Sequence, residues 1–202
     1  MFALVEDGSI TKYLNGNKGI TIGDNQYPKA IFTLWTKSER EAIGIYEVEI
    51  DNSKKKDEQW YINTNVTYAF ANGKVTGSYG DSTAKAHADT KWTQKEIDDG
   101  DAPDGADTNT VKAEGLKTVL IRNIKKQAAG ILQDTDWYIV RKADAGTAVP
   151  SAITNHRAAV RTKAANMETQ VTNASDTPAL ETLYTRNENG VRPLGEFPEL
   201  GS

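Results

Sequence analysis

The chain has 202 residues, a formal net charge of −4 and no cysteine. Its length suits one medium-sized domain or two small ones, and the lack of cysteine excludes disulfides, thiolate metal sites and cysteine nucleophiles. The negative charge gives no electrostatic basis for binding nucleic acid or an anionic membrane, and no stretch approaches the roughly 20 apolar residues of a membrane span. We therefore expect neither nucleic acid nor a membrane as a partner.

Short apolar runs alternate with turn-forming residues from the N-terminus to about residue 80. Asp7-Gly8 and Asn72-Gly73 are dipeptides that favour positive φ and tight two-residue hairpins. The apolar runs between such turns predict seven strands: Phe2–Val5, Ile10–Leu14, Ile20–Ile22, Ile45–Ile50, Trp60–Ile62, Val66–Phe70 and Lys74–Tyr79.

One short helix is expected just before residue 45. Ser38 and Glu41 have the spacing of a capping box, and Gly44 stands where a helix C-cap glycine belongs. Trp35 is expected to pack with this helix against the strand that follows.

Residues 81–110 change character, because acids, Gly and Pro replace the apolar runs. Such a composition cannot bury enough surface to offset its ordering entropy, so we predict a flexible, exposed connector. Calcium binding is the alternative, since Asp99, Asp101 and Asp104 could supply oxygen ligands. Their spacing departs from an EF-hand loop and Pro103 interrupts it, which favours the connector.

From Val111 onward, apolar residues recur at helical spacing. The pattern predicts two amphipathic helices over Val111–Leu132 and Ser151–Val171, and a short third helix that begins at Thr177-Pro178. The fold class is therefore α+β. We expect the chain to divide into a β-rich domain (1–80), an acidic connector (81–110), a helical domain with an antiparallel hairpin (111–185) and an extended C-terminal arm (186–202).

No group of catalytic residues is apparent. The two histidines, His87 and His156, have no cluster of Asp, Glu or His converging on them in sequence. We expect no enzyme, no cofactor and no metal.

The candidate site residues are structural or partner-binding. The junction between the two long helices is expected to be anchored by four residues: Asp136, Trp137, Arg157 and Arg161. The planar fork of an arginine suits a carboxylate partner there. Candidate partner contacts are apolar or aromatic: Trp35, Tyr46, Trp60, Tyr61, Leu194 and Phe197. Such residues anchor interfaces, although core packing is the alternative for the aromatic ones.

Two parts of the chain resemble proteins of tailed-bacteriophage tails. The run Ile131-Leu132-Gln133-Asp134-Thr135-Asp136-Trp137, followed by Pro150 and by His156-Arg157-Ala158-Ala159-Val160-Arg161, resembles a C-terminal module described as a tail assembly chaperone or tail-fibre-associated domain. His156 replaces the usual tyrosine of that module, and Val160 the usual leucine. The segment from Phe32 to Tyr46 is similar to another tail module, and the resemblance covers about Phe32–Tyr79 and Ala113–Tyr184.

This resemblance implies a structural virion protein that contacts other phage tail proteins in a multi-subunit assembly and passes through the host cytoplasm during assembly. A tail or tail-fibre assembly chaperone that is absent from the mature virion is the first alternative. A receptor- or glycan-binding module that uses exposed Trp60 and Tyr61 is the second.

Overall fold

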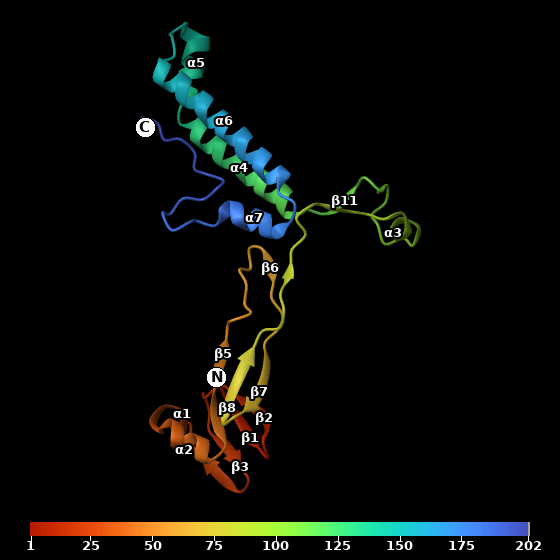
Figure 1. Cartoon of the computed structure of the whole chain (residues 1–202), viewed down its shortest axis with the longest axis vertical. Helices are drawn as coiled ribbons and strands as arrows, with labels where there is room; N and C mark the ends of the chain where they lie inside the picture. The colour runs from red at the N-terminus through yellow and green to blue at the C-terminus, as the bar shows by residue number, and fades with distance from the viewer. Residues whose placement is uncertain (202) are drawn as a thin grey trace. The chain divides into compact units, whose positions relative to one another are not determined.

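The structure is a computed structural model that describes residues 1–201 (Figure 1). The chain divides into two compact units, with the boundary between Thr83 and Ala84. Strands dominate the first unit and helices the second, which confirms the predicted α+β class.

A five-stranded sheet forms the centre of the first unit. Its strands are β1 (Phe2–Glu6), β2 (Ser9–Leu14), β5 (Ile45–Asp51), β7 (Thr67–Ala71) and β8 (Lys74–Ser78), in the order β2-β1-β5-β8-β7. The two predicted hairpins are confirmed, because β1 pairs with β2 and β7 with β8 across two-residue turns. Both residues of each turn have positive φ, from 49° at Asp7 to 76° at Gly8. The β5–β8 pair is parallel, whereas the other three pairs are antiparallel.

Apolar side chains cover both faces of this sheet. One cluster consists of Leu4, Ile20, Ile31, Phe32 and Ile45. The other consists of Ala3, Val5 and Val75. Neighbouring residues of β1 enter different clusters because successive side chains of a strand point to opposite faces. The edge strands β2 and β7 also approach each other, since the Tyr13 and Tyr68 rings lie 5.1 Å apart.

Smaller elements complete the first unit: β3 (Ile20–Ile22), β4 (Asn25–Tyr27), α1 (Ile31–Leu34), α2 (Lys37–Ala42) and β6 (Tyr61–Ile62), which pairs with β9 (Thr83–Ala84). The capping box of α2 was predicted two residues too late, at Ser38 and Glu41. Thr36 accepts a hydrogen bond from the Glu39 amide, and the Glu39 carboxylate accepts one from the Thr36 amide. Thr36 has the extended backbone that an N-cap needs, whereas Ser38 is already helical. Gly44 ends the helix with φ 82°, as predicted.

The stretch predicted as a flexible, exposed connector, residues 81–110, contains secondary structure. It holds β10 (Thr90–Lys91) and α3 (Gln94–Asp98), and β10 pairs in antiparallel fashion with β11 (Val111–Ala113), which follows the stretch directly. Thr93 and Glu96 form a second capping box at the start of α3. Val111 is therefore in a strand, and the first long helix begins at Leu116 instead.

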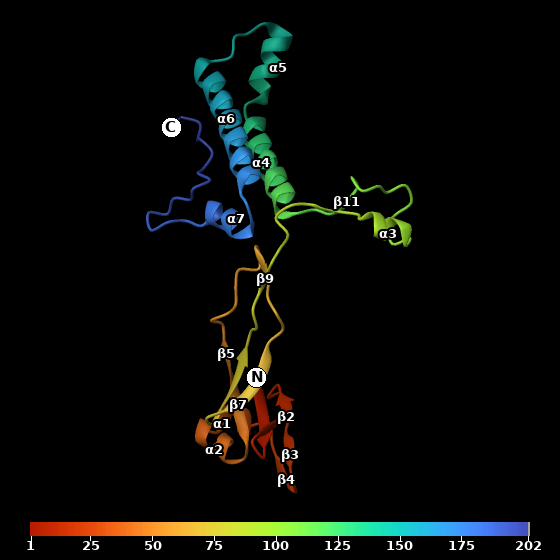
Figure 2. The same ribbon diagram turned by 45° about the vertical axis from the view of Figure 1, so that its right-hand side comes forward.

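The second unit contains four further helices: α4 (Leu116–Gln133), α5 (Asp136–Ala145), α6 (Ser151–Asn173) and α7 (Thr177–Tyr184). In Figure 1 and Figure 2, α4 and α6 lie side by side. Their order is antiparallel, because the amine of Lys117 donates to the Thr172 carbonyl, 2.8 Å away, while Arg157 contacts the opposite end of α4 at Leu132. The predicted helical hairpin is thus present.

Buried side chains line the facing surfaces of these helices at the spacing that the sequence predicted. They are Leu120, Ile124 and Ala128 of α4, Ile153, Val160, Ala164, Met167 and Val171 of α6, and Leu180 of α7. Spacings of three and four residues place these side chains on one face of each helix. Within residues 1–201, no helix is both long and apolar enough to cross a membrane.

Backbone groups that precede α4 hold its first turn. The amides of Leu116 and Lys117 donate to the carbonyls of Ala86 and His87, at 3.0 Å each. The Gly115 amide donates to the Asp89 carboxylate at 2.6 Å, and this hydrogen bond is the main reason that the pKa of Asp89 is lowered. These contacts satisfy amides that a helix start otherwise leaves unpaired.

Candidate functional site

A buried arginine holds the corner where α4, α5 and α6 meet. Arg157 of α6 is 7% exposed, and its guanidinium donates to the Leu132 carbonyl and to the Thr135 hydroxyl, at 2.7 Å each. It also lies 2.8 Å from the Asp136 carboxylate. Thr135 is 3% exposed and donates to the same Leu132 carbonyl at 3.0 Å. One side chain therefore satisfies the end of α4 and the start of α5 together.

The four residues expected to anchor this corner do not all take part. The structure brings Arg157 and Asp136 together, as the sequence reasoning expected. Arg161 is exposed, and its contact is a 3.5 Å hydrogen bond to the Arg157 carbonyl. Trp137 was expected to anchor the corner as well, but its side chain is 51% exposed and so is not buried there. The phase of α5 explains this result, because that helix turns Tyr138 and Arg141 toward the interior instead.

Helix α5 exposes three large apolar side chains to solvent. Trp137, Ile139 and Val140 are 51%, 43% and 65% exposed, and no residue of this helix is buried. The Trp137 and Tyr138 rings lie 3.8 Å apart, and the Arg141 guanidinium lies 4.7 Å from the Trp137 ring centre. An aromatic pair and two exposed aliphatic side chains are unusual on a helix that has no buried residue.

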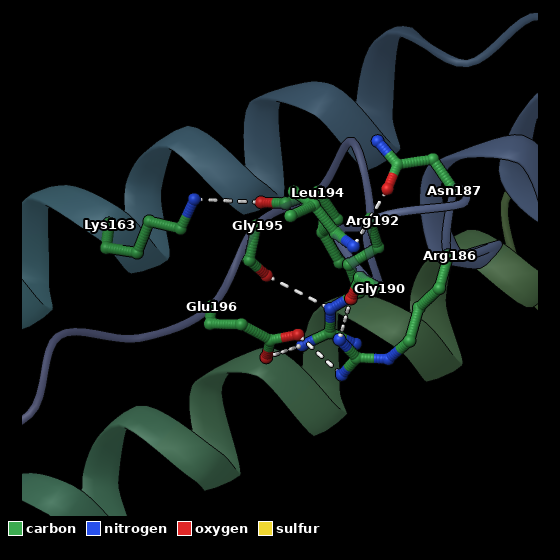
Figure 3. Close-up of polar contacts among 9 residues, drawn as sticks. Lys163, Arg186, Asn187, Gly190, Arg192, Leu194, Gly195 and Glu196 are labelled. Atoms are coloured by element: carbon green, nitrogen blue, oxygen red, sulfur yellow. Dashed lines mark hydrogen bonds and ion pairs between the residues drawn. The ribbon is translucent and has the colours of Figure 1, made fainter.

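The C-terminal segment was expected to be extended, but it folds back onto the second unit. Leu194 is 1% exposed, its amide donates to the Leu183 carbonyl, and its carbonyl accepts from the Lys163 amine at 2.9 Å. Glu196 accepts from Arg186 and from Arg192, at 2.7 Å each (Figure 3). A buried leucine with satisfied backbone groups supplies the anchor that the sequence pattern did not reveal.

This folding also changes the surroundings of Tyr184, which is half-buried at the end of α7. Burial raises the pKa of its hydroxyl, and the nearby positive charge of Arg192 opposes that rise. The Arg192 guanidinium lies 5.7 Å from the centre of the Tyr184 ring. The arm therefore packs against α7 through an aromatic as well as an aliphatic contact.

Two adjoining cavities lie where the end of the arm meets α4 and α6. The first has a volume of about 290 Å³ and is lined by Ile131, Asp134, Thr135, His156, Phe197, Pro198, Glu199 and Leu200. The second has about 320 Å³ and is lined by Ala152, Asn155, His156, Ala159, Pro198, Glu199 and Gly201. His156, at 9% exposed, lines both of them.

The proposed partner contacts lie mostly inside the chain. Trp60 and Tyr61 are 3% and 6% exposed, and Leu194 of the arm is 1% exposed where the arm packs on the second unit. Three others are partly buried: Trp35 against the Tyr27 ring, Tyr46 against the Phe70 ring, and Phe197 in the wall of the first cavity. The structure does not gather these six residues into one surface. The aromatic residues among them pack within the chain, as the core-packing alternative held.

Sequence reasoning missed two buried polar residues and the exposed face of α5. Thr135 gave no signal, because a single polar residue between helices is usually on the surface. The position of His156 could have been suspected, since it lies four residues before buried Val160 and three after buried Ile153. In the part of the chain that the structure describes, no group of three or more His, Asp or Glu side chains is placed to hold a metal ion.

Comparison with protein-family models, with curated proteins and with solved structures found no match to this chain.

Proposed function

We propose that this chain is a non-enzymatic structural component of a bacteriophage tail that acts by contacting other tail proteins. The observation that carries the proposal is that α5 exposes three large apolar side chains to solvent, Trp137, Ile139 and Val140. Aromatic and aliphatic side chains of this size are typical anchors of protein interfaces. The same helix begins within the Asp134-Thr135-Asp136-Trp137 motif that resembles a tail-associated module.

The anchored corner supports a contact role for α5. Arg157 fixes both the end of α4 and the first residue of α5, so the helix presents its apolar side chains from a rigid base. Rigid presentation lowers the conformational entropy that a partner contact would cost. The occupant of this face in the proposal is a neighbouring tail subunit.

Burial of Trp60 and Tyr61 removes the observation on which the glycan-binding alternative depended. A ring that stacks on a sugar has to be reachable from solvent, and these two rings are not.

The test is a mass-spectrometric inventory of washed phage particles combined with a variant of the α5 face. We expect peptides of this chain in the particles at a stoichiometric level, and we expect the double variant Ile139→Ser, Val140→Ser to be lost from them. Lys126→Ser, which changes an exposed residue of α4, is the matched control and should be incorporated normally. Circular dichroism of both purified variants checks that the helices are retained.

A complete absence of the chain from washed particles would contradict the virion role. If the chain then co-purified with a tail subunit from infected cells, the assembly-chaperone alternative would replace it. Normal incorporation of the double variant would show that α5 is not the contact surface.

A further inference from the structure

The cavity beneath the end of the C-terminal arm has the character of a small binding site. At about 290 Å³ it lies at the lower end of the size range of small-molecule sites, which is roughly 300–1,000 Å³. Its walls are mainly apolar, from Ile131 of α4 and from Phe197 and Leu200 of the arm. All of these residues belong to the second unit, so the cavity is complete within one compact body.

His156 is the polar group that distinguishes this cavity from a packing defect. Its side chain is 9% exposed, lines both adjoining cavities, and makes no hydrogen bond with the residues that the structure describes. The neighbouring Arg157 is equally buried but has three partners. Its ring nitrogens are not closed off from solvent, since the buried unpaired side-chain polar atom among the described residues is Nε of Arg141. A ring nitrogen that is open to the cavity and unpaired can accept a hydrogen bond from a ligand there.

The charge at the rim favours a cation. Asp134 lines the cavity, and its carboxylate forms no ion pair with the described residues. The nearest buried cation, Arg157, is already bound to Asp136, to Thr135 and to the Leu132 carbonyl. The negative charge of Asp134 is therefore left for another positive group.

We propose that this cavity binds a primary ammonium group that is attached to a short apolar body. The ammonium would donate to the imidazole of His156 and to the carboxylate of Asp134, and the aliphatic part would lie against Ile131, Phe197 and Leu200. An ammonium has three donors and no acceptor, which matches one ring nitrogen and one carboxylate. Small aliphatic amines and the side chain of lysine share this chemistry. The proposal does not depend on the role in a phage tail.

The experiment is an NMR titration of the full-length chain with n-butylammonium, and with n-butanol as a neutral probe of similar size. We expect butylammonium to shift the ring signals of His156 and the amides of residues 131–135 and 197–200 in a saturable way at millimolar concentration. Butanol should bind roughly tenfold more weakly, because it lacks the positive charge. A third titration, with N-acetyl-lysine amide, distinguishes a lysine side chain from a free amine as the natural source.

Matched variants locate the site. Asp134→Asn keeps the size of the side chain and should weaken butylammonium binding roughly two- to fivefold, as expected for a partly exposed ion pair. Asp144→Asn, at an exposed position of α5 that lines neither cavity, should leave binding unchanged. His156→Gln, which retains a hydrogen-bonding side chain, should weaken binding without loss of helical circular dichroism.

Three results would overturn the proposal: no saturable shift at His156 with either ammonium probe, equal binding of butanol and butylammonium, or equal effects of the two aspartate variants. Binding of both ammonium probes would support the shared chemistry. Binding of one alone would support it and would identify the source, a partner's lysine for N-acetyl-lysine amide or a free amine for butylammonium.

Discussion

At the scale of single residues, Arg157 has the largest expected effect on stability. Replacing it by lysine keeps the charge but removes the planar fork, so that one ammonium cannot reach the Leu132 carbonyl, the Thr135 hydroxyl and Asp136 together. We expect Arg157→Lys to lower the free energy of unfolding by about 2 kcal/mol, because buried polar groups then lose their partner. Urea denaturation of the full-length chain measures this change.

Arg161→Lys is the matched control, since Arg161 is one turn further along the same helix but exposed. Its expected effect is within about 0.5 kcal/mol, as for most surface substitutions. Equal midpoints for the two variants would show that the corner contributes nothing to stability.

The same corner shows what residue-level reasoning could predict. Arg157 and Asp136 have complementary charges, and the antiparallel arrangement of the two long helices brings them together, so their pairing was accessible from the sequence. The position of Trp137 was not, because it depends on the rotation of α5 about its own axis. The apolar residues of that helix do not fall on one side in the sequence, so no face is clearly preferred. In the structure Trp137, Ile139 and Val140 are exposed, whereas Tyr138 and Arg141 are half-buried.

At the scale of elements, short-range rules succeeded where backbone conformation is decided locally. Asp7-Gly8 and Asn72-Gly73 specified two hairpins, because few other residue pairs tolerate two consecutive positive φ angles. The parallel β5–β8 pair was missed, since no local pattern encodes which distant strand becomes a neighbour. Helix α3 was missed because five residues are too few to show a helical period, although its Thr93–Glu96 capping box was present in the sequence.

Glu96 links α3 to β11 and makes this region sensitive to acid. Its carboxylate contacts the Lys112 amine and the Thr93 amide, which lower the pKa of Glu96 from 4.5 to about 2. The folded state therefore favours the ionised form. Its contribution to stability is complete above about pH 4.5 and is lost as the pH falls from 4.5 toward 2.

We expect the fluorescence of Trp92 to report this loss in wild-type protein, because the Lys112 amine lies 4.7 Å from the centre of that ring. Glu96→Gln should remove the part of the pH dependence that belongs to this carboxylate and should loosen the region already at neutral pH. Glu188→Gln, at an exposed position in the C-terminal segment, should retain the wild-type pH profile. Superimposable profiles for wild type and Glu96→Gln would contradict the assignment.

At the scale of the whole molecule, the chain has two separate cores. The composition predicted a β-rich and a helical part, since the apolar period changes from two to about 3.6 along the sequence. The boundary in the structure lies between Thr83 and Ala84. The docking of the C-terminal arm was not predictable from a periodic pattern, because one leucine, Leu194, supplies its buried contact.

Because the cores are separate, a destabilising substitution in one unit should leave the amide protection of the other unit unchanged. Ile45 and Leu180 are both fully buried, the first in the sheet unit and the second in the helical unit. Truncation of either to alanine should cost about 3 kcal/mol, through lost contacts and the cavity that remains. Native-state hydrogen exchange followed by mass spectrometry can assign that cost to segments of the chain.

Ile45→Ala should speed exchange in β1, β5 and β8 and leave α4 and α6 at wild-type protection. Leu180→Ala should speed exchange in α4 and α6 and leave β1, β5 and β8 at wild-type protection. Each variant is the control for the other, because both remove a similar apolar volume from a fully buried position. If Ile45→Ala lowered protection equally in both units, the chain would unfold as one cooperative body. Two cores with independent protection would instead mean that a partner bound to the α5 face stabilises the helical unit alone, because ligand binding stabilises only the unit whose unfolding destroys its site.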